Sequence, residues 1–198
     1  LHHDADLSKL DRAGIVHRLD KNTSGLMVVA KNPKSQKHLV NQLQTHSVER
    51  EYSAIVYGHM ISGGSINEPI GRDPKDRVKQ AILINGKEAI THYRAIDRFK
   101  SHTHVKAILE TGRTHQIRVH LSHQGYPLIG DPMYGGRVRF PKKACQELKD
   151  ELTNFQRQAL HSKKLTLKHP VTGKSMTWKA DLPDDMQELL NILKKYDS

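Results

Sequence analysis

Residues 17–32 read HRLDKNTSGLMVVAKN, and this stretch governs the expected fold. Its apolar run, Leu26–Ala30, predicts a short buried strand that Asn32 and Pro33 end. Asp20 would then lie at the edge of a sheet, held in place by the strand behind it. An Asp followed by Asn, Thr, Ser and Gly is also a common turn former, whose carboxylate accepts hydrogen bonds from backbone N–H groups. From the residues alone, both interpretations of Asp20 stay open.

Outward from this stretch, hydrophobic spacing predicts several strands and flanking helices. Side chains alternate along Arg50–Tyr57 as expected of a strand covered on both faces. Further strands are expected within Lys87–Glu110, with a polar break near Ser101, and at Leu160–Leu167 and Ser175–Ala180. Helices are expected at Lys34–Gln44, from Thr114 as N-cap to Gln124, at 144–158, and from Asp184 as N-cap to Lys195. A loop or irregular hairpin is expected at Ile61–Ile70, and loops are expected at the basic segment Gly71–Lys79 and at Asp131–Pro141. The predicted class is α+β, with a largely antiparallel or mixed central sheet in one domain, residues 1–198.

A second cluster of polar residues begins at the predicted turn Thr111–Gly112 and continues into the following helix. Arg113, His115 and Arg118 would present donors near the start of that helix. Arg118 adjoins the apolar stripe, so its guanidinium could emerge at the edge of the core, where an arginine usually has a carboxylate partner. A basic helix solvated on one side, or simple phosphate contact, is the alternative.

The net charge is +11, from 32 Lys and Arg against 21 Asp and Glu. This excess, with a sequence pI of about 9.7, predicts a polyanionic partner, RNA or DNA rather than a membrane. A solvated basic surface would give the same charge. The single Cys145 cannot form an internal disulfide, and no apolar run approaches the roughly 20 residues of a membrane span. We therefore expect a cytoplasmic protein, and a chain that starts at Leu1 rather than Met leads us to expect a fragment of a longer one.

The 14 histidines raise the question of a metal site. The possible groups are His2/His3, His102/His104 and His115/His120/His123. Their spacings do not match a zinc signature, and only one cysteine is present, so no metal site is predicted. The sequence also has no Walker-A loop, no G-x-S-x-G elbow and no dinucleotide-binding glycine motif.

Five segments together resemble the RluA-type RNA pseudouridine synthases. Residues 17–32 resemble the signature around that family's catalytic aspartate. The others are REYSAIVYG (50–58), LETGRTHQIRVHL (109–121), YPLIGDPMYGG (126–136) and QALHSKKLTLKHPVTGK (158–174). The resemblance spans nearly the whole chain. It implies a pseudouridine synthase catalytic domain that isomerises uridine in RNA without a cofactor.

The resemblance also implies roles for individual residues. Asp20 would be the nucleophile or base, kept anionic by Arg118, and Tyr52 would stack on the uracil opposite an apolar wall at Ile117. The implied RNA contacts are Arg18, which would fill the space left by the extruded base, and Lys21, Arg72, Arg77, Arg113 and His115. Tyr52 could equally be strand core, and Arg18 a surface charge. Whether Asp20 attacks C6 or C1′, or removes a ribose proton, stays open.

Within the family, residues 58–74 (GHMISGGSINEPIGRDP) and 86–94 (GKEAITHYR) resemble enzymes that act on large-subunit ribosomal RNA. The predicted partner is therefore a stem-loop of that RNA, and the predicted state is a monomer. Such proteins carry an S4-like RNA-binding domain and an early part of the catalytic domain ahead of the region that Leu1 begins. We expect both to be missing from this chain.

Two other functions are compatible with the residues. A non-catalytic rRNA-binding or ribosome-assembly module would have the same basic charge, but it has little use for an anion such as Asp20 facing RNA. A His-dependent metallohydrolase acting on nucleic acid would need a metal, which metal analysis of the purified protein would detect.

Overall fold

The computed structural model describes residues 5–198, and its centre is a seven-stranded sheet within that range. The strand order is β1-β8-β2-β7-β6-β3, with β9 also paired to β8. The bounds are β1 Ser24–Gly25, β2 Glu49–Tyr57, β3 Gly64–Asn67, β6 Ile90–Arg98, β7 His102–Leu109, β8 Leu160–Lys168 and β9 Ser175–Lys179. β1 pairs with β8 in parallel and the other neighbours are antiparallel. The predicted α+β class with a mixed sheet is confirmed.

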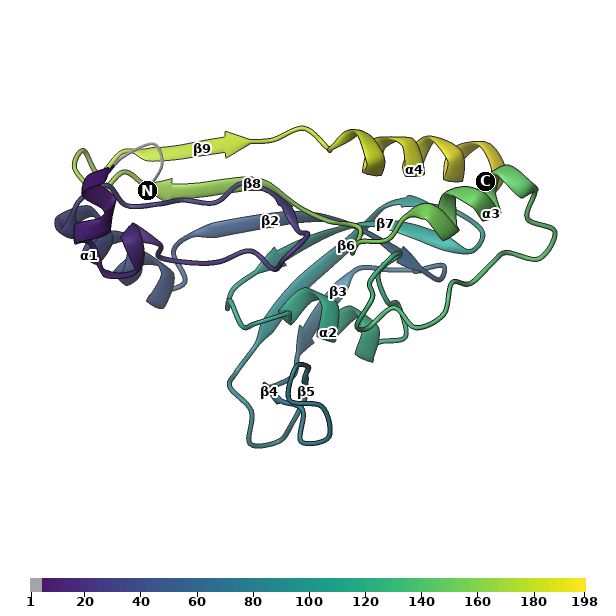
Figure 1. The fold of residues 1–198 in the computed structure, drawn as a ribbon, viewed down its shortest axis with the longest axis horizontal. Helices are drawn as coiled ribbons and strands as arrows, with labels where there is room; N and C mark the ends of the chain where they lie inside the picture. The colour runs from purple at the N-terminus through teal and green to yellow at the C-terminus, as the bar shows by residue number, and fades with distance from the viewer. Residues whose placement is uncertain (1–4) are drawn as a thin grey trace.

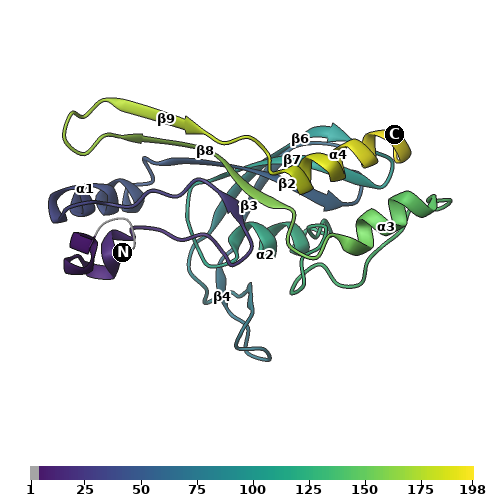
Figure 2. The same ribbon diagram turned by 45° about the horizontal axis from the view of Figure 1, so that its top comes forward.

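The helices lie at the two ends and on the faces of this sheet (Figure 1). They are α1 Pro33–Gln44, α2 Gln116–His123, α3 Gln146–Asn154 and α4 Asp184–Tyr196. α1 lies at one end, beside the first described residues, whereas α3 and α4 lie together at the other end (Figure 2). Among residues 5–198, no helix has the length and apolar character needed to cross a membrane.

Strand β2 is the centre of the core because both of its faces are buried, as its alternating side chains predict. Tyr52, Ala54 and Val56 join a cluster with Ile117 and other residues of α2 and β7 on one face. Ile55 joins a second cluster, formed with α3 and α4, on the opposite face. The same strand therefore supplies core side chains to the layers on both of its faces. Tyr52 also lines the candidate active site.

A separate hairpin extends from the edge of the sheet (Figure 1). Its strands are β4 (Ile70–Arg72) and β5 (Gln80–Ile82), and they flank the basic loop. Ile70 packs with Ala89 and Val119 in a small buried cluster, to which Ile82 and Tyr134 add partly buried surface. The hairpin is thereby held against α2.

Two expected elements near the ends of the sheet differ in the structure. Leu26–Ala30 is not a strand of the sheet, because the strand is the pair Ser24–Gly25. The segment is buried on one face only: Leu26, Val28 and Ala30 pack in a core cluster, whereas Met27 is 44% exposed. An apolar run predicts burial only where a second layer covers it, and Met27 has no such cover. Within Ile61–Ile70, where a loop or irregular hairpin is expected, β3 forms the sheet edge by pairing with β6 rather than within the segment.

Helix boundaries also differ from the prediction. α2 begins after His115 rather than after Thr114. α3 is shorter than 144–158, and α4 has Pro183, not Asp184, as its N-cap residue. α1 matches the prediction closely, because the Asn32 side chain accepts a hydrogen bond from Ser35 N at 2.8 Å and Pro33 opens the helix.

Candidate active site

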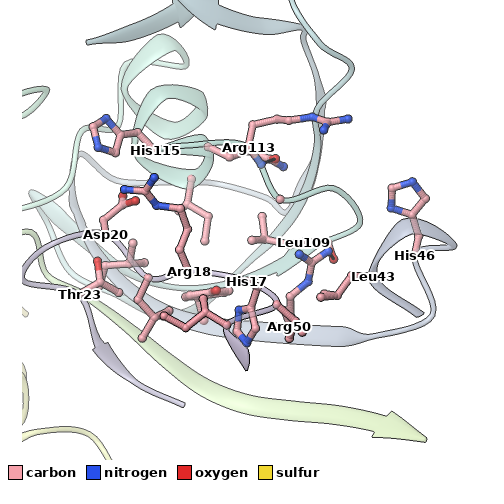
Figure 3. Close-up of a pocket in the computed structure, with 18 of the residues that line it drawn as sticks. His17, Arg18, Asp20, Thr23, Leu43, His46, Arg50, Leu109, Arg113 and His115 are labelled. Carbon is pink, nitrogen blue, oxygen red and sulfur yellow. Dashed lines mark hydrogen bonds between the residues drawn. The ribbon is translucent and has the colours of Figure 1, made fainter. Parts of the chain in front are cut away.

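A cavity of about 590 Å³ lies between α1, β2, the 15–23 segment and the start of α2. Figure 3 shows Asp20, Thr23 and His115 at one end of it and Leu43, His46 and Arg50 at the other. Of the residues predicted for the site, its lining includes Arg18, Asp20, Tyr52, Arg113, His115 and Ile117. Residues separated by nearly 100 positions in the sequence therefore meet in one cavity.

Asp20 lies in a tight turn fixed to the sheet. Thr23 N donates to the Asp20 carbonyl at 3.0 Å, which closes the turn. The buried Gln158 amide donates to the Lys21 carbonyl at 2.6 Å and to Thr23 Oγ1 at 2.9 Å. Gly25, at φ +105°, then brings the chain so close to β8 that a Cβ there would lie 2.3 Å from the Ser162 carbonyl. The turn is thus held from both sides, and the Asp20 carboxylate is left to face the cavity.

The Asp20 carboxylate pairs with a buried arginine. Arg118 Nη1 donates to Asp20 Oδ2 at 3.2 Å. The same guanidinium binds Asp131 through two bonds, Nε to Oδ2 at 2.7 Å and Nη2 to Oδ1 at 2.9 Å. The side chain of Arg118 is 5% exposed, that of Asp131 is fully buried and that of Asp20 is 13% exposed. Asp131 therefore fixes the guanidinium, and the third nitrogen is presented to Asp20.

This arrangement keeps the buried charges in place. Burial alone would lower the pKa of Arg118, but the hydrogen bonds and charges of Asp131 and Asp20 raise it. Burial alone would raise the pKa of Asp131, and the Arg118 hydrogen bonds outweigh that effect and lower it. Arg118 thus stays cationic and Asp131 anionic, so a positive charge is always present beside Asp20.

Tyr52 and Ile117 form the apolar part of the cavity wall. They are 6% and 3% exposed and belong to the same core cluster. The pairing of β2 with β8 is irregular at Glu51 and Tyr52, which places Tyr52 opposite Ser162. Burial raises the pKa of Tyr52, so the phenol is neutral. A neutral, rigid ring at the side of a polar turn is suited to contact a flat heterocycle.

His115 precedes α2 in a left-handed conformation, with φ +58°, and explains why the helix begins later than predicted. The Gln116 side chain accepts hydrogen bonds from Thr111 Oγ1 at 2.8 Å and Arg113 N at 2.9 Å, which fixes this turn. His115 Nδ1 lies 2.8 Å from Tyr134 Oη. Burial lowers the pKa of His115, although the nearby Asp20 opposes the shift.

The far end of the cavity holds a buried cation that the sequence did not indicate. Arg50 is 6% exposed, and its Nη2 donates to the Glu110 carbonyl at 2.7 Å. Among the described residues its Nε has no hydrogen-bond partner. A Cβ on Gly112 would lie 2.5 Å from Arg50 Nη1, so this glycine allows the guanidinium to fit under the turn.

His17 also lies at this end of the cavity, and its burial leads us to expect that the stability of the fold decreases in mild acid. Val28 N donates to His17 Nε2 at 3.0 Å. Burial, aided by the charge of Arg50, lowers the pKa of His17 from 6.5 to about 4. Between these values the unfolded chain binds a proton that the folded chain excludes, so stability present above pH 6.5 is lost as the pH falls toward 4. For this group the free energy of unfolding should fall by at most about 1.4 kcal/mol per pH unit.

Urea unfolding at pH 7 and pH 5 tests this expectation in wild type and His17→Gln. The glutamine oxygen can accept the Val28 hydrogen bond but does not titrate. The variant should therefore lose less stability between the two pH values than wild type, since the other buried histidines are common to both proteins. Equal losses would show that His17 does not contribute.

The remaining predicted RNA contacts lie outside this cavity. Lys21 is exposed, in the Asp20 turn. Arg72 lies on the β4–β5 hairpin, where its Nη1 donates to the Arg77 carbonyl at 2.8 Å. The Arg77 side chain lines neither this cavity nor the second one described below. The site residues that sequence reasoning missed are Asp131, Arg50 and Gln158, and the only signal for Asp131 was the expectation that Arg118 has a carboxylate partner.

The histidines considered for metal binding are dispersed. His102 Nδ1 pairs with Asp197 at 2.7 Å, and His104 Nδ1 pairs with Asp97 at 2.9 Å. Across residues 5–198, no three or more His, Cys, Asp or Glu side chains are grouped so as to hold a metal ion. His2 and His3 lie outside the described residues.

The chain is similar in sequence to known proteins along almost its whole length. Residues 3–123 match the RNA pseudouridylate synthase family model. The chain is 55% identical over 195 residues to ribosomal large subunit pseudouridine synthase D of Pseudomonas aeruginosa, covering 98% of this chain and 61% of that protein. It is 50% identical over 194 residues to the protein of the same name from Escherichia coli K12, covering 98% and 60%. The chain thus spans about three fifths of the length of these curated relatives.

Solved structures show the same architecture. Human RNA Pseudouridylate Synthase Domain Containing 4 superposes with a TM-score of 0.72 at 27% identity, over 91% of this chain and 75% of that one. Human RNA Pseudouridylate Synthase Domain Containing 1 shares the fold, with a TM-score of 0.68 at 23% identity, over 93% and 81%. With a family model that matches more than half of its residues, the chain belongs to the RNA pseudouridylate synthase family.

Proposed function

We propose that this chain isomerises uridine to pseudouridine in RNA, with Asp20 as the reacting carboxylate and no cofactor. One observation carries the proposal: Asp20 is held by the buried Arg118 at a cavity that Tyr52 and Ile117 also line. An anion, a fixed cation and apolar surface for a flat base are the groups this reaction requires.

The reaction breaks the N1–C1′ bond, turns the base within the cavity and joins C5 to C1′. The proton leaves C5 and N1 gains one, so no redox partner or group carrier is needed. Asp20 acts by adding to C6 of the base, by adding to C1′, or by removing a ribose proton. Each of these roles needs the ionised carboxylate, and the Arg118 guanidinium lies beside it at 3.2 Å.

The target uridine must leave its stack to reach Asp20, because the carboxylate lies in a cavity rather than on a flat surface. Extrusion costs a few kcal/mol, and stacking on an aromatic ring such as Tyr52 recovers about 1–3 kcal/mol. Arg18, beside Asp20 in the lining, is suited to enter the space that the base leaves. Arg113 and His115 contribute donors for phosphate at the same opening.

The proposed substrate is large-subunit ribosomal RNA, in a stem-loop. The names of the relatives from P. aeruginosa and E. coli support this choice, and so does the net charge of +11. A monomeric, cytoplasmic enzyme is part of the same proposal. The S4-like RNA-binding domain expected in a longer protein stays a prediction.

Incubation of the purified chain with transcribed large-subunit ribosomal RNA tests the proposal. Pseudouridine mapping by carbodiimide modification and reverse transcription should show a stop at one or a few uridines that is absent without protein. Small-subunit RNA transcribed in the same way is the control. Binding of the large-subunit RNA without any new pseudouridine would instead favour the non-catalytic rRNA-binding module.

A further inference from the structure

A second cavity, of about 420 Å³, lies between the β4–β5 hairpin and the turn that leads into α2. Its lining carries three cationic side chains, Arg72, Lys87 and Arg113. The described residues that line it include no carboxylate. Lys87 is exposed and was not among the residues predicted to contact RNA. A concave, purely cationic site of this kind is suited to a phosphate group.

The two cavities meet at Gly112 and Arg113, which line both of them. Gly112 has no side chain to separate them, and its contact with Arg50 leaves no room for one. Arg113 Nε donates to the Glu88 carbonyl at 2.8 Å, which ties this side chain to the segment that carries Lys87. The two cavities therefore adjoin at residues 112 and 113, so neighbouring nucleotides of one RNA strand are suited to occupy them.

The wall of the second cavity is also connected to the reacting groups. Gln80 N, on β5, donates to Tyr134 Oη at 2.9 Å, and His115 Nδ1 lies 2.8 Å from the same oxygen. The Arg118 guanidinium lies over the Tyr134 ring, 5.0 Å from its centre. The hairpin is thus positioned relative to Asp20 by side-chain contacts, rather than being a separate arm.

We propose that the second cavity binds the phosphate that links the target uridine to its neighbour in the same RNA strand, through Arg72, Lys87 and Arg113. This inference rests on the proposed function and names a subsite of the same active site. No aromatic ring lines the cavity within the described residues, so it offers cations to the backbone and no stacking surface to a base. The contact is therefore independent of base sequence.

Single phosphate replacements test this subsite. RNA carrying a neutral methylphosphonate on one side or the other of the target uridine is compared with natural RNA. With wild type, one of the two replacements should lower kcat/KM by about 10-fold, as expected for loss of one charge-assisted contact. With Lys87→Gln, natural RNA should already react about 10-fold more slowly, and the same replacement should add less than about a 2-fold further loss.

Lys174→Gln is the matched control, because it removes the same charge from an exposed turn between β8 and β9. It should retain the full effect of the methylphosphonate. The inference would be overturned if the methylphosphonate kept its full wild-type effect in Lys87→Gln, Arg72→Gln and Arg113→Gln. Turnover by wild type in the same experiment would still support the proposed function.

Binding provides a second readout that does not depend on turnover. The logarithm of RNA affinity falls linearly with the logarithm of salt concentration, with a slope that counts neutralised phosphates. Lys87→Gln should reduce that slope by about 0.7, the value for one contact to a single strand. An unchanged slope would exclude the phosphate contact even if no pseudouridine were formed by the wild-type chain.

Discussion

Asp20→Asn is expected to lower pseudouridine formation by on the order of 10⁴-fold or more, the size of the loss when one member of a catalytic group is removed from other enzymes. The amide has the shape of the carboxylate and can still accept the hydrogen bond from Arg118 Nη1. It has no charge, so it can neither add to the uridine nor remove a proton from it. Single-turnover mapping of pseudouridine in ribosomal RNA measures the loss.

RNA affinity should change by no more than about 3-fold in the same variant, because loss of the Asp20 charge leaves the number of phosphate contacts unchanged. Asp181→Asn is the matched control, since Asp181 is exposed and distant in sequence from the site residues. It should keep wild-type turnover. Turnover by Asp20→Asn equal to that of wild type would remove Asp20 from the chemistry and favour the RNA-binding module.

Asp131→Asn is expected to lower the free energy of unfolding by about 2–3 kcal/mol, the range of a charge-assisted hydrogen bond. Asp131 Oδ1 also accepts from Met133 N at 2.9 Å and Tyr134 N at 3.1 Å. These bonds require the amide oxygen at that position, which turns the amide N–H₂ toward Arg118 Nε, a donor facing a donor. Asp20 still balances the Arg118 charge, so the loss stays below the roughly 3–5 kcal/mol of an unpaired buried charge.

Turnover should also fall by on the order of 10²-fold in Asp131→Asn, because Arg118 is then free to shift toward Asp20 and displace the carboxylate. Urea unfolding and single-turnover mapping measure the two effects. Asp185→Asn is the control, since Arg157 binds Asp185 through two similar bonds of 2.6 and 2.7 Å at the surface. That variant should lose at most about 1 kcal/mol of stability. Comparable losses in both variants would show that burial of the Arg118 pair has no special effect.

Local patterns predicted the parts of the fold that local forces determine. Alternation along β2 indicated burial on both faces, and Asn32 with Pro33 indicated the start of α1, because side-chain spacing and capping act within a few residues. The prediction of a buried strand at Leu26–Ala30 was wrong because the burial of this segment depends on which elements lie over it. The predicted start of α2 was wrong because the Gln116 side chain accepts hydrogen bonds from Thr111 and Arg113, which precede it, and this holds His115 outside the helix.

For the candidate site as well, some residues could be predicted from the sequence and others could not. The resemblance indicated Asp20, Tyr52 and Arg118, and the structure brings the first and last within a hydrogen bond. Asp131 lies 13 positions from Arg118, on a loop, and no spacing rule links an arginine on a helix to a carboxylate after a turn. Lys87 and Arg50 are ordinary basic residues in the sequence. Their positions at the two cavities depend on sheet register, which a single sequence does not specify.

The double burial of β2 has a consequence for how the molecule fluctuates. β2 is hydrogen-bonded to β7 and β8 along most of its length, and both of its faces lie within core clusters. We expect its amide protons to exchange with solvent only when the whole domain opens, whereas those of the 73–79 loop between β4 and β5 should exchange through local opening. The wall against which a base would bind is therefore as stable as the folded state itself, and motion that admits or releases RNA is left to the loops.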